Sequence, residues 1–210
     1  MENKDKIIVD LAGGSGAWSR KYKDAGYIVF NITLPDYNIL ETVIRNDYII
    51  FRGDKRLIVR KSDIYGILVA PVCTMFSFAR RNAKIPRDLK EGMRLVITCL
   101  NIIWECRYNH KLAFWCLENP MGYLRQFLGK PVFTFDPCDF GDPYTKKTDL
   151  WGYFNIPKGK RVEPEFKDFE SGKRMSKMHY ETSCKSGERR KILRSITPAG
   201  FAKAFYEANK

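Results

Sequence analysis

An α/β fold, with a mostly parallel sheet and helices on both faces, is the fold class that three observations in this 210-residue sequence predict. Residues 7–11 form a short apolar run that leads directly into glycines, which indicates a buried strand followed by a tight turn. A second apolar run, residues 67–70, stops at Pro71, and a third, residues 112–117, ends at a carboxylate. Runs of this kind are typical of strands that are covered on both faces.

The rest of the chain supplies elements that fit such a fold. Residues 27–32 are spaced as a second strand, and residues 47–60 predict a β-hairpin, which we interpret as a surface insertion. Pro86 is placed to begin a long amphipathic helix, and Thr197, as N-cap, to begin a final one. One set of apolar residues recurs at steps of three and four and predicts a single buried face of the long helix: Leu89, Met93, Val96, Ile97, Leu100, Ile103 and Trp104.

Composition and cysteine use exclude several classes of protein. Hydrophobic residues make up 44% of the chain, which indicates a globular domain rather than a disordered one. No apolar run approaches the roughly 20 residues of a membrane span, and the first residues do not read as a signal peptide. We therefore expect a soluble, cytoplasmic protein that does not bind membranes. The six cysteines include no Cys-x-x-Cys pair, so we expect reduced thiols and no metal site.

The charge of the chain favours a nucleic-acid partner. The net charge is +13, which is large for this length and predicts a polyanionic ligand. Much of the excess lies in two blocks, residues 80–94 with a net +4 and residues 155–194 with a net +6. This clustering favours a binding face over a generally basic surface.

Reactive side chains follow the predicted strands. Cys73 comes just after the strand that stops at Pro71, and Glu118 comes directly after the strand of residues 112–117. Because ligands of open α/β sheets bind at the carboxyl ends of the strands, we expect both groups at one edge, with Cys73 as a nucleophile. The alternatives are a small buried hydrophobe at Cys73 and a capping role for Glu118.

The glycine turn after the first strand is typical of Rossmann-like folds. There, strand, turn and helix bring backbone N–H groups close to a cofactor. The glycines at residues 13–16 do not form the G-x-G-x-x-G fingerprint, so a tight turn without a ligand remains the alternative.

Five segments, taken in order, resemble the motifs of the cytosine-C5 DNA methyltransferases, and most closely the short members of phage or prophage type. The resemblance covers most of the chain apart from the hairpin and the second basic block. The segments are Asp10-Leu-Ala-Gly-Gly-Ser-Gly-Ala-Trp18, Pro71-Val-Cys73, Glu118-Asn-Pro120, Phe140-Gly-Asp-Pro-Tyr-Thr-Lys-Lys-Thr148 and Arg194-Ser-Ile-Thr-Pro-Ala-Gly-Phe-Ala-Lys203.

This resemblance implies a Rossmann-like methyltransferase fold and a specific chemistry. Cys73 would add to C6 of cytosine, and Glu118, with Asn119 in the same motif, would hydrogen-bond the ring as charge builds on it. Lys146 or Lys147 would take the supporting place that an arginine has in the family. Carbon 5 would then receive a methyl group from S-adenosyl-L-methionine, and the target base would be flipped out of a DNA duplex.

The resemblance also assigns two sets of binding residues. The implied cofactor-binding residues are Asp10, Ala12, Gly14, Ser15, Gly16, Trp18, Asn31, Pro71 and Thr197. The implied nucleic-acid-binding residues are Ser77, Arg80, Arg81, Lys84 and Lys147.

The sequence departs from the family at several of these positions. Ala12 replaces an aromatic residue, Asn31 stands near the place of a ribose-binding carboxylate, and Thr148 replaces an arginine. Residues 1–154 and 192–210 would form the catalytic domain. Residues 155–191 would form a short basic arm or loop in place of a target-recognition domain, with target choice either loose or made by an accessory specificity protein.

Two alternatives to DNA methylation remain open from the sequence. One keeps the fold and the cofactor but acts on RNA, a nucleotide or another pyrimidine. The other is a nucleic-acid-binding protein whose catalytic site has decayed.

Overall fold

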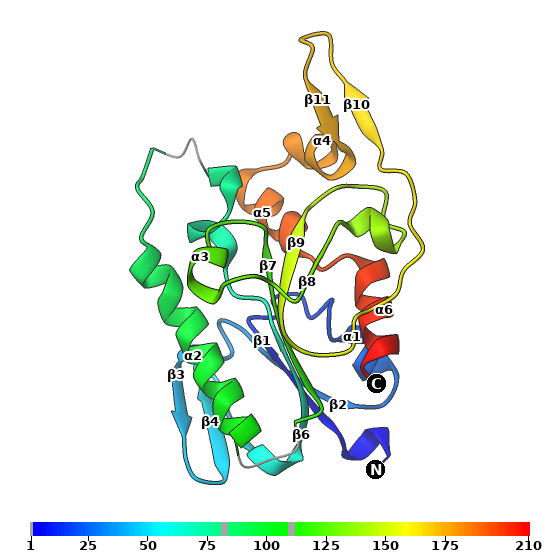
Figure 1. Ribbon diagram of the computed structural model, residues 1–210. Helices are drawn as coiled ribbons and strands as arrows, with labels where there is room; N and C mark the ends of the chain where they lie inside the picture. The colour runs from blue at the N-terminus through cyan, green and yellow to red at the C-terminus, as the bar shows by residue number, and fades with distance from the viewer. Residues whose placement is uncertain (1, 81–83, 109–111) are drawn as a thin grey trace.

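The computed structural model describes residues 2–80, 84–108 and 112–210, and its centre is a six-stranded mixed sheet (Figure 1). The strand order is β2-β1-β6-β7-β9-β8, and the first four strands run parallel. Strand β9 pairs antiparallel with both β7 and β8. The bounds are β1 Ile7–Leu11, β2 Ile28–Ile32, β6 Ile64–Val69, β7 Phe114–Pro120, β8 Phe133–Phe135 and β9 Thr148–Tyr153. The predicted α/β class with a mostly parallel sheet is confirmed.

Helices cover both faces of this sheet, as predicted. Helix α2 (Leu89–Tyr108) lies over one face, while α1 (Arg20–Asp24) and α6 (Ala199–Ala208) lie over the other (Figure 1). Alternation along the strands separates the two cores, because successive side chains point to opposite faces. In β1, Val9 packs in the α2-side core and Ile8 in the α6-side core.

The predicted hairpin belongs to a second, three-stranded sheet. It comprises β3 (Asn38–Ile44), β4 (Tyr48–Arg52) and β5 (Arg56–Arg60), of which the first strand was not predicted. Its inward side chains Phe51 and Val59 are buried in the α2-side core. The face of the hairpin that carries Phe51 and Val59 is therefore part of the core, and the interpretation of the hairpin as a surface insertion is wrong for that face.

Helix α2 differs from its prediction in two respects. It begins at Leu89 rather than at Pro86, and the Asp88 carboxylate accepts a hydrogen bond from the Glu91 N–H at 2.8 Å, as an N-cap does. The predicted buried face is wrong for Ile97 and Trp104, whose exposed fractions are 50% and 61%. Both follow directly after a residue of the inward stripe, and one residue turns a helix by about 100°.

The segment predicted as a basic arm or loop contains regular structure, which the sequence did not indicate. It holds a hairpin of β10 (Phe166–Asp168) and β11 (Arg174–Ser176), followed by helices α4 (Lys177–Ser183) and α5 (Gly187–Ser195). The hairpin projects from the rest of the molecule (Figure 1). Polar contacts hold this unit together: the guanidinium of Arg190 donates to the backbone carbonyls of Thr182, Ser183 and Lys185. Because little apolar surface is buried here, the sequence shows no periodicity.

Short segments complete the fold. Helix α3 is Arg125–Leu128, and 3₁₀ turns occupy Asn3–Asp5, Lys61–Asp63, Cys73–Met75, Phe78–Arg80 and Pro137–Phe140. Within the described ranges, no helix is long and apolar enough to cross a membrane. The same residues contain no group of three or more His, Cys, Asp or Glu side chains that could hold a metal ion.

Candidate active site

Cys73 lies in the turn that follows β6. The N–H of Ala70 still bonds to the carbonyl of Leu11 in β1, at 3.0 Å, and the chain then leaves the sheet. The backbone N–H groups of Phe76 and Ser77 both donate to the Cys73 carbonyl at 2.9 Å, which closes a 3₁₀ turn. The Cys73 side chain is half-buried at this turn, at the carboxyl end of the strand, as predicted.

Glu118 and Asn119 lie within β7, because pairing with β9 continues the strand to Pro120; the prediction that the strand ends at residue 117 is therefore wrong. Asn119 is fully buried, and its Nδ2 donates to the carbonyl of Pro71 at 3.0 Å. This bond ties the end of β7 to the segment that carries Cys73. The Asn119 Oδ1 atom is buried and accepts no hydrogen bond from any residue that the structure describes.

The pairing of β7 with β6 and β9, and the bond from the Met121 N–H to the Lys147 carbonyl, bring the segments that carry Cys73, Glu118 and Lys146 together at one end of the sheet. Burial and then the charge of Glu118 raise the pKa of the Cys73 thiol, while the ammonium of Lys146 acts to lower it. Burial also raises the pKa of Glu118, and Lys146 again opposes the shift. Of the two lysines considered, Lys146 is thus the one beside the reactive groups, and Lys147 is exposed.

An ion pair behind Glu118 was missed by the sequence analysis. Asp149 is fully buried in β9, where it pairs in register with Asn119, and its charge further raises the pKa of Glu118. Arg125 grips the Asp149 carboxylate with two bonds, Nε to Oδ2 at 2.6 Å and Nη2 to Oδ1 at 2.5 Å, and the Thr134 hydroxyl donates to Oδ1 at 2.7 Å. The signal in the sequence was an aspartate at the start of an apolar strand, because a buried charge needs a partner.

The turn after β6 is held by two sets of contacts, one from Arg87 just before α2 and one from the turn after β7. The Arg87 guanidinium donates to the carbonyls of Met75, at 2.8 Å, and Ser77, at 2.9 Å. The N–H of Tyr123 donates to the Phe76 carbonyl at 2.9 Å. Gly122 lies so close to this carbonyl that a Cβ atom would overlap with the oxygen. The turn that carries Cys73 is therefore fixed from two sides.

The predicted nucleic-acid-binding residues have different surroundings. Ser77 forms an isolated bridge with Gly122, and the Arg80 guanidinium contacts Met75 Sδ and the carbonyl of Ile85, at 3.0 and 3.1 Å. Lys84 is exposed, and Arg81 lies outside the described residues. The Arg80 guanidinium thus contacts residues of its own loop, whereas Lys146 is the cation that acts to lower the pKa of the Cys73 thiol.

The glycine turn after β1 has an unusual backbone. Ala12, Gly14 and Gly16 all have positive φ angles, of 56°, 51° and 68°, and Ala12 is the one non-glycine residue of the described chain with this conformation. At Gly13 a Cβ atom would overlap with the Asp10 carboxyl group and the Asn31 amide. Ser15 is exposed at the outside of the turn. The backbone therefore lies directly against these two side chains.

Asp10 and Asn31 each leave one buried oxygen without a partner. Oδ2 of Asp10 accepts from the Ser19 hydroxyl at 2.6 Å, and Nδ2 of Asn31 donates to the Gly14 carbonyl at 2.9 Å. The other oxygen of each side chain accepts no hydrogen bond from the described residues. Burial raises the pKa of Asp10 to about 6. Two buried acceptors beside a glycine turn fit a ligand that carries amine or hydroxyl donors.

The C-terminal segment returns to this turn. Trp18 is buried against α6, with ring centroids 5.7 Å from Phe201 and 5.3 Å from Phe205. Pro198 occupies the N-cap position of α6, so the predicted cap at Thr197 is wrong by one residue, and Thr197 is half-buried just before it. Trp18 thus joins the segment after the glycine turn to α6.

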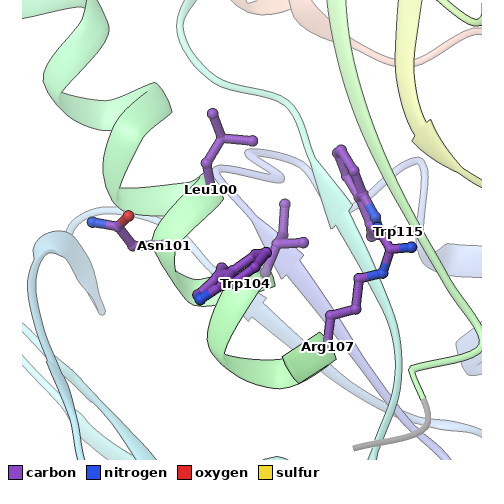
Figure 2. Close-up of a pocket in the computed structure, with 6 residues that line it drawn as sticks. Leu100, Asn101, Trp104, Arg107 and Trp115 are labelled. Atoms are coloured by element: carbon purple, nitrogen blue, oxygen red, sulfur yellow. The ribbon is translucent and has the colours of Figure 1, made fainter. Parts of the chain in front are cut away.

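A separate cavity of about 340 Å³ lies between α2 and β7 (Figure 2). In Figure 2, Trp104 and Arg107 on α2 lie on one side of it and Trp115 on the other. The six lining residues are Leu100, Asn101, Ile103, Trp104, Arg107 and Trp115, none of which is a predicted site residue. The cluster of Cys73, Glu118 and Lys146 is therefore distinct from this cavity.

No protein-family model and no curated protein matches this chain. A function must therefore be argued from the side chains and their geometry.

Proposed function

We propose that this protein transfers a methyl group from S-adenosyl-L-methionine to C5 of cytosine in DNA, with Cys73 as the nucleophile. The observation that carries the proposal is the cluster of a thiol, a carboxyl group and an ammonium group at the ends of two neighbouring strands. The fold, with a glycine turn after β1 on the same sheet edge, suits a methyltransferase of the Rossmann-like type.

Cys73 would begin the reaction by adding to C6 of the cytosine ring. After the thiol loses its proton to water, the sulfur forms a bond to C6, and the electron pair of the C5–C6 double bond becomes available at C5. S-adenosyl-L-methionine, when bound, supplies the methyl group for C5. Water then takes the proton from C5, the double bond re-forms as the sulfur–C6 bond breaks, N3 returns to Glu118 any proton it received, and Cys73 is released as a thiolate.

Glu118 would act as the proton donor to the ring. Burial and the nearby Asp149 raise its pKa, so Glu118 keeps a proton over a wider pH range than an exposed glutamate. A protonated Glu118 can donate to N3 of cytosine as negative charge builds there. The neutral form also removes the charge that opposes ionisation of Cys73. Proton donation and nucleophile activation are thus favoured by the same protonation state.

Asp10 and Asn31 would hold the cofactor at the glycine turn. Their unpartnered oxygens are acceptors, and S-adenosyl-L-methionine carries an amino group and ribose hydroxyl groups as donors. The net charge of +13 supports DNA as the substrate, because phosphate contacts by Lys and Arg provide most of the sequence-independent affinity. The target cytosine would leave the base stack to reach Cys73.

The test uses DNA that contains 5-fluorocytosine, incubated with the cofactor and analysed by denaturing gel and mass spectrometry. Fluorine at C5 cannot leave as a proton, so an active enzyme remains bonded to the base through its sulfur. We expect a covalent adduct with the wild type and with Cys184→Ser, a matched control at an exposed cysteine, and none with Cys73→Ser.

Two results would contradict the proposal. One is the absence of an adduct from wild-type protein that binds the DNA, which would instead support a non-catalytic nucleic-acid-binding protein. The other is an adduct that persists in Cys73→Ser.

A further inference from the structure

The outward face of the hairpin β4–β5 has an unusual composition. Six side chains alternate outward along the two strands, and they pair across the hairpin in three rows: Tyr48 with Arg60, Ile50 with Ile58, and Arg52 with Arg56. The solvent-facing side of an antiparallel sheet usually carries mixed polar residues. Here there are three arginines, two isoleucines and a tyrosine, and neither an acidic nor a small polar residue.

The Arg52–Arg56 row places two like charges directly opposite each other. Both side chains are exposed, and neither forms an ion pair with any residue in the described part of the chain. Like charges in this cross-strand position destabilise a sheet. Neighbouring Lys55, by contrast, pairs with Asp36 at 2.7 Å. The two arginines thus concentrate positive charge that this chain does not neutralise.

Arg60, the third arginine of this face, already has a hydrogen-bond partner on the protein. Arg60 donates to the Tyr48 hydroxyl at 3.2 Å, and this bond, followed by the charges of Asp63 and Asp47, raises its pKa. The main site for an external anion is therefore the Arg52–Arg56 row rather than the Tyr48–Arg60 row.

Apolar side chains lie between the two charged rows. Ile58 has an exposed fraction of 51%, and its partner Ile50 is half-buried. The exposed Tyr48 ring lies below the Arg60 guanidinium, with 5.6 Å between the guanidinium carbon and the ring centroid. Guanidinium groups beside aliphatic and aromatic surface suit a nucleic-acid strand, because its phosphates bind arginine and its bases and sugars pack on apolar side chains.

The Arg52–Arg56 end of the hairpin lies on the same side of the molecule as Cys73. The turn between the two strands bonds to the loop after β2: Asp54 N–H to the Pro35 carbonyl at 3.3 Å and Lys55 N–H to the Asp36 carbonyl at 2.9 Å. Strand β2 runs parallel to β6, so its carboxyl end lies at the edge where Cys73 is found.

We propose that the outward face of β4–β5 is a nucleic-acid-binding surface separate from the Cys73 site, on which Arg52 and Arg56 bind backbone phosphates and Ile50, Ile58 and Tyr48 contact sugars or bases. Nothing in this inference depends on methyl transfer.

The test measures binding of a fluorescein-labelled oligonucleotide, single-stranded and as a duplex, by anisotropy over a range of salt concentrations. The double variant Arg52→Gln/Arg56→Gln should bind at least several-fold more weakly. Because each phosphate contact contributes to the salt dependence, the slope of log K against log salt should shrink by about 1.4 for the single strand and about 1.8 for the duplex.

Matched variants make the result specific. Lys23→Gln/Lys203→Gln removes two exposed charges from α1 and α6, on the other side of the central sheet, and should leave the slope almost unchanged. Arg52→Lys/Arg56→Lys keeps the charge and should retain most of the slope. An equal loss in the α1/α6 variant would overturn the proposal. Unchanged oligonucleotide binding together with lost binding of polyglutamate would also overturn it, in favour of an acidic protein partner.

Discussion

The charges of Glu118 and Lys146 act in opposite directions on the Cys73 thiol. At pH values where Glu118 is ionised, we predict that Glu118→Gln lowers the pKa of Cys73 and speeds its alkylation by iodoacetamide, because a negative charge is removed. Lys146→Met should raise the pKa and slow alkylation. Mass spectrometry across pH measures both rates, with the exposed Cys184 in the same molecule as the reference.

The same substitution should have the opposite effect on catalysis. Glu118→Gln cannot donate a carboxylic proton to the ring, so methyl transfer should fall by about 10²–10⁴-fold even though the thiol is more reactive. A general loss of structure would also speed alkylation of the buried thiols Cys99, Cys106 and Cys116, so unchanged rates at these three serve as the control for folding. If both variants shifted alkylation of Cys73 in the same direction, the cluster would not have the geometry described.

Asp10 makes stability depend on pH in a defined direction. Its pKa is about 6 in the folded protein and 3.8 as an ordinary aspartate, so the folded state binds the proton more tightly. The contribution of Asp10 to stability is thus full below about pH 4 and is lost as the pH rises to about 6, by about 3 kcal/mol.

Asp10→Asn tests this dependence, since the amide cannot ionise and still offers an acceptor to Ser19. Urea unfolding at several pH values should show the variant gaining stability relative to the wild type between about pH 4 and pH 6. If the free energy of unfolding changed with pH in the same way for both proteins, the raised pKa of Asp10 would be contradicted.

At the scale of elements, Arg87 connects the start of α2 to the Cys73 turn. Arg87→Lys keeps the charge but loses the planar fork that reaches the carbonyls of both Met75 and Ser77. We predict faster amide hydrogen exchange in residues 73–78 and slower adduct formation. Lys90→Arg, at the second residue of α2, is the control. If amide hydrogen exchange were unchanged in Arg87→Lys, the backbone contacts to Gly122 and Tyr123 alone would be enough to hold the Cys73 turn, and the role given to Arg87 would be wrong.

The elements also show what the sequence could predict. Strands β1, β6 and β7 were found because each is an apolar run buried on both faces, and the position of Cys73 just after β6 followed from them. The continuation of β7 through Glu118 to Pro120 was missed, because polar residues and a proline follow the apolar run there. Helices α4 and α5 were missed because hydrogen bonds from arginines to carbonyl and hydroxyl oxygens, rather than an apolar stripe, hold them together. Asp149 was missed because its partner Arg125 is distant in sequence, and a single chain does not reveal such pairs.

At the scale of the molecule, α6 completes the core on one face of the sheet. Phe201 is fully buried and stacks on Phe135, with ring centroids 4.2 Å apart. Phe201→Ala should destabilise the protein by about 3–5 kcal/mol, because it removes a large buried ring and leaves a cavity. Ile97→Ala, at a half-exposed position of α2, should cost far less in the same urea titration. Equal losses would mean that α6 is not an integral part of the core.

The contact between Trp18 and α6 also bears on how the protein is made. Trp18 packs on Phe201 and Phe205, and the Tyr22 hydroxyl donates to the Asn209 carbonyl at 3.3 Å. During synthesis, the segment around the glycine turn is made long before α6. Trp18 therefore has no packing partners on α6 until Phe201 and Phe205 have been synthesised. A chain that stalls before α6 would therefore leave Trp18 and Tyr22 without these contacts, and the segment after the glycine turn would lack part of its packing.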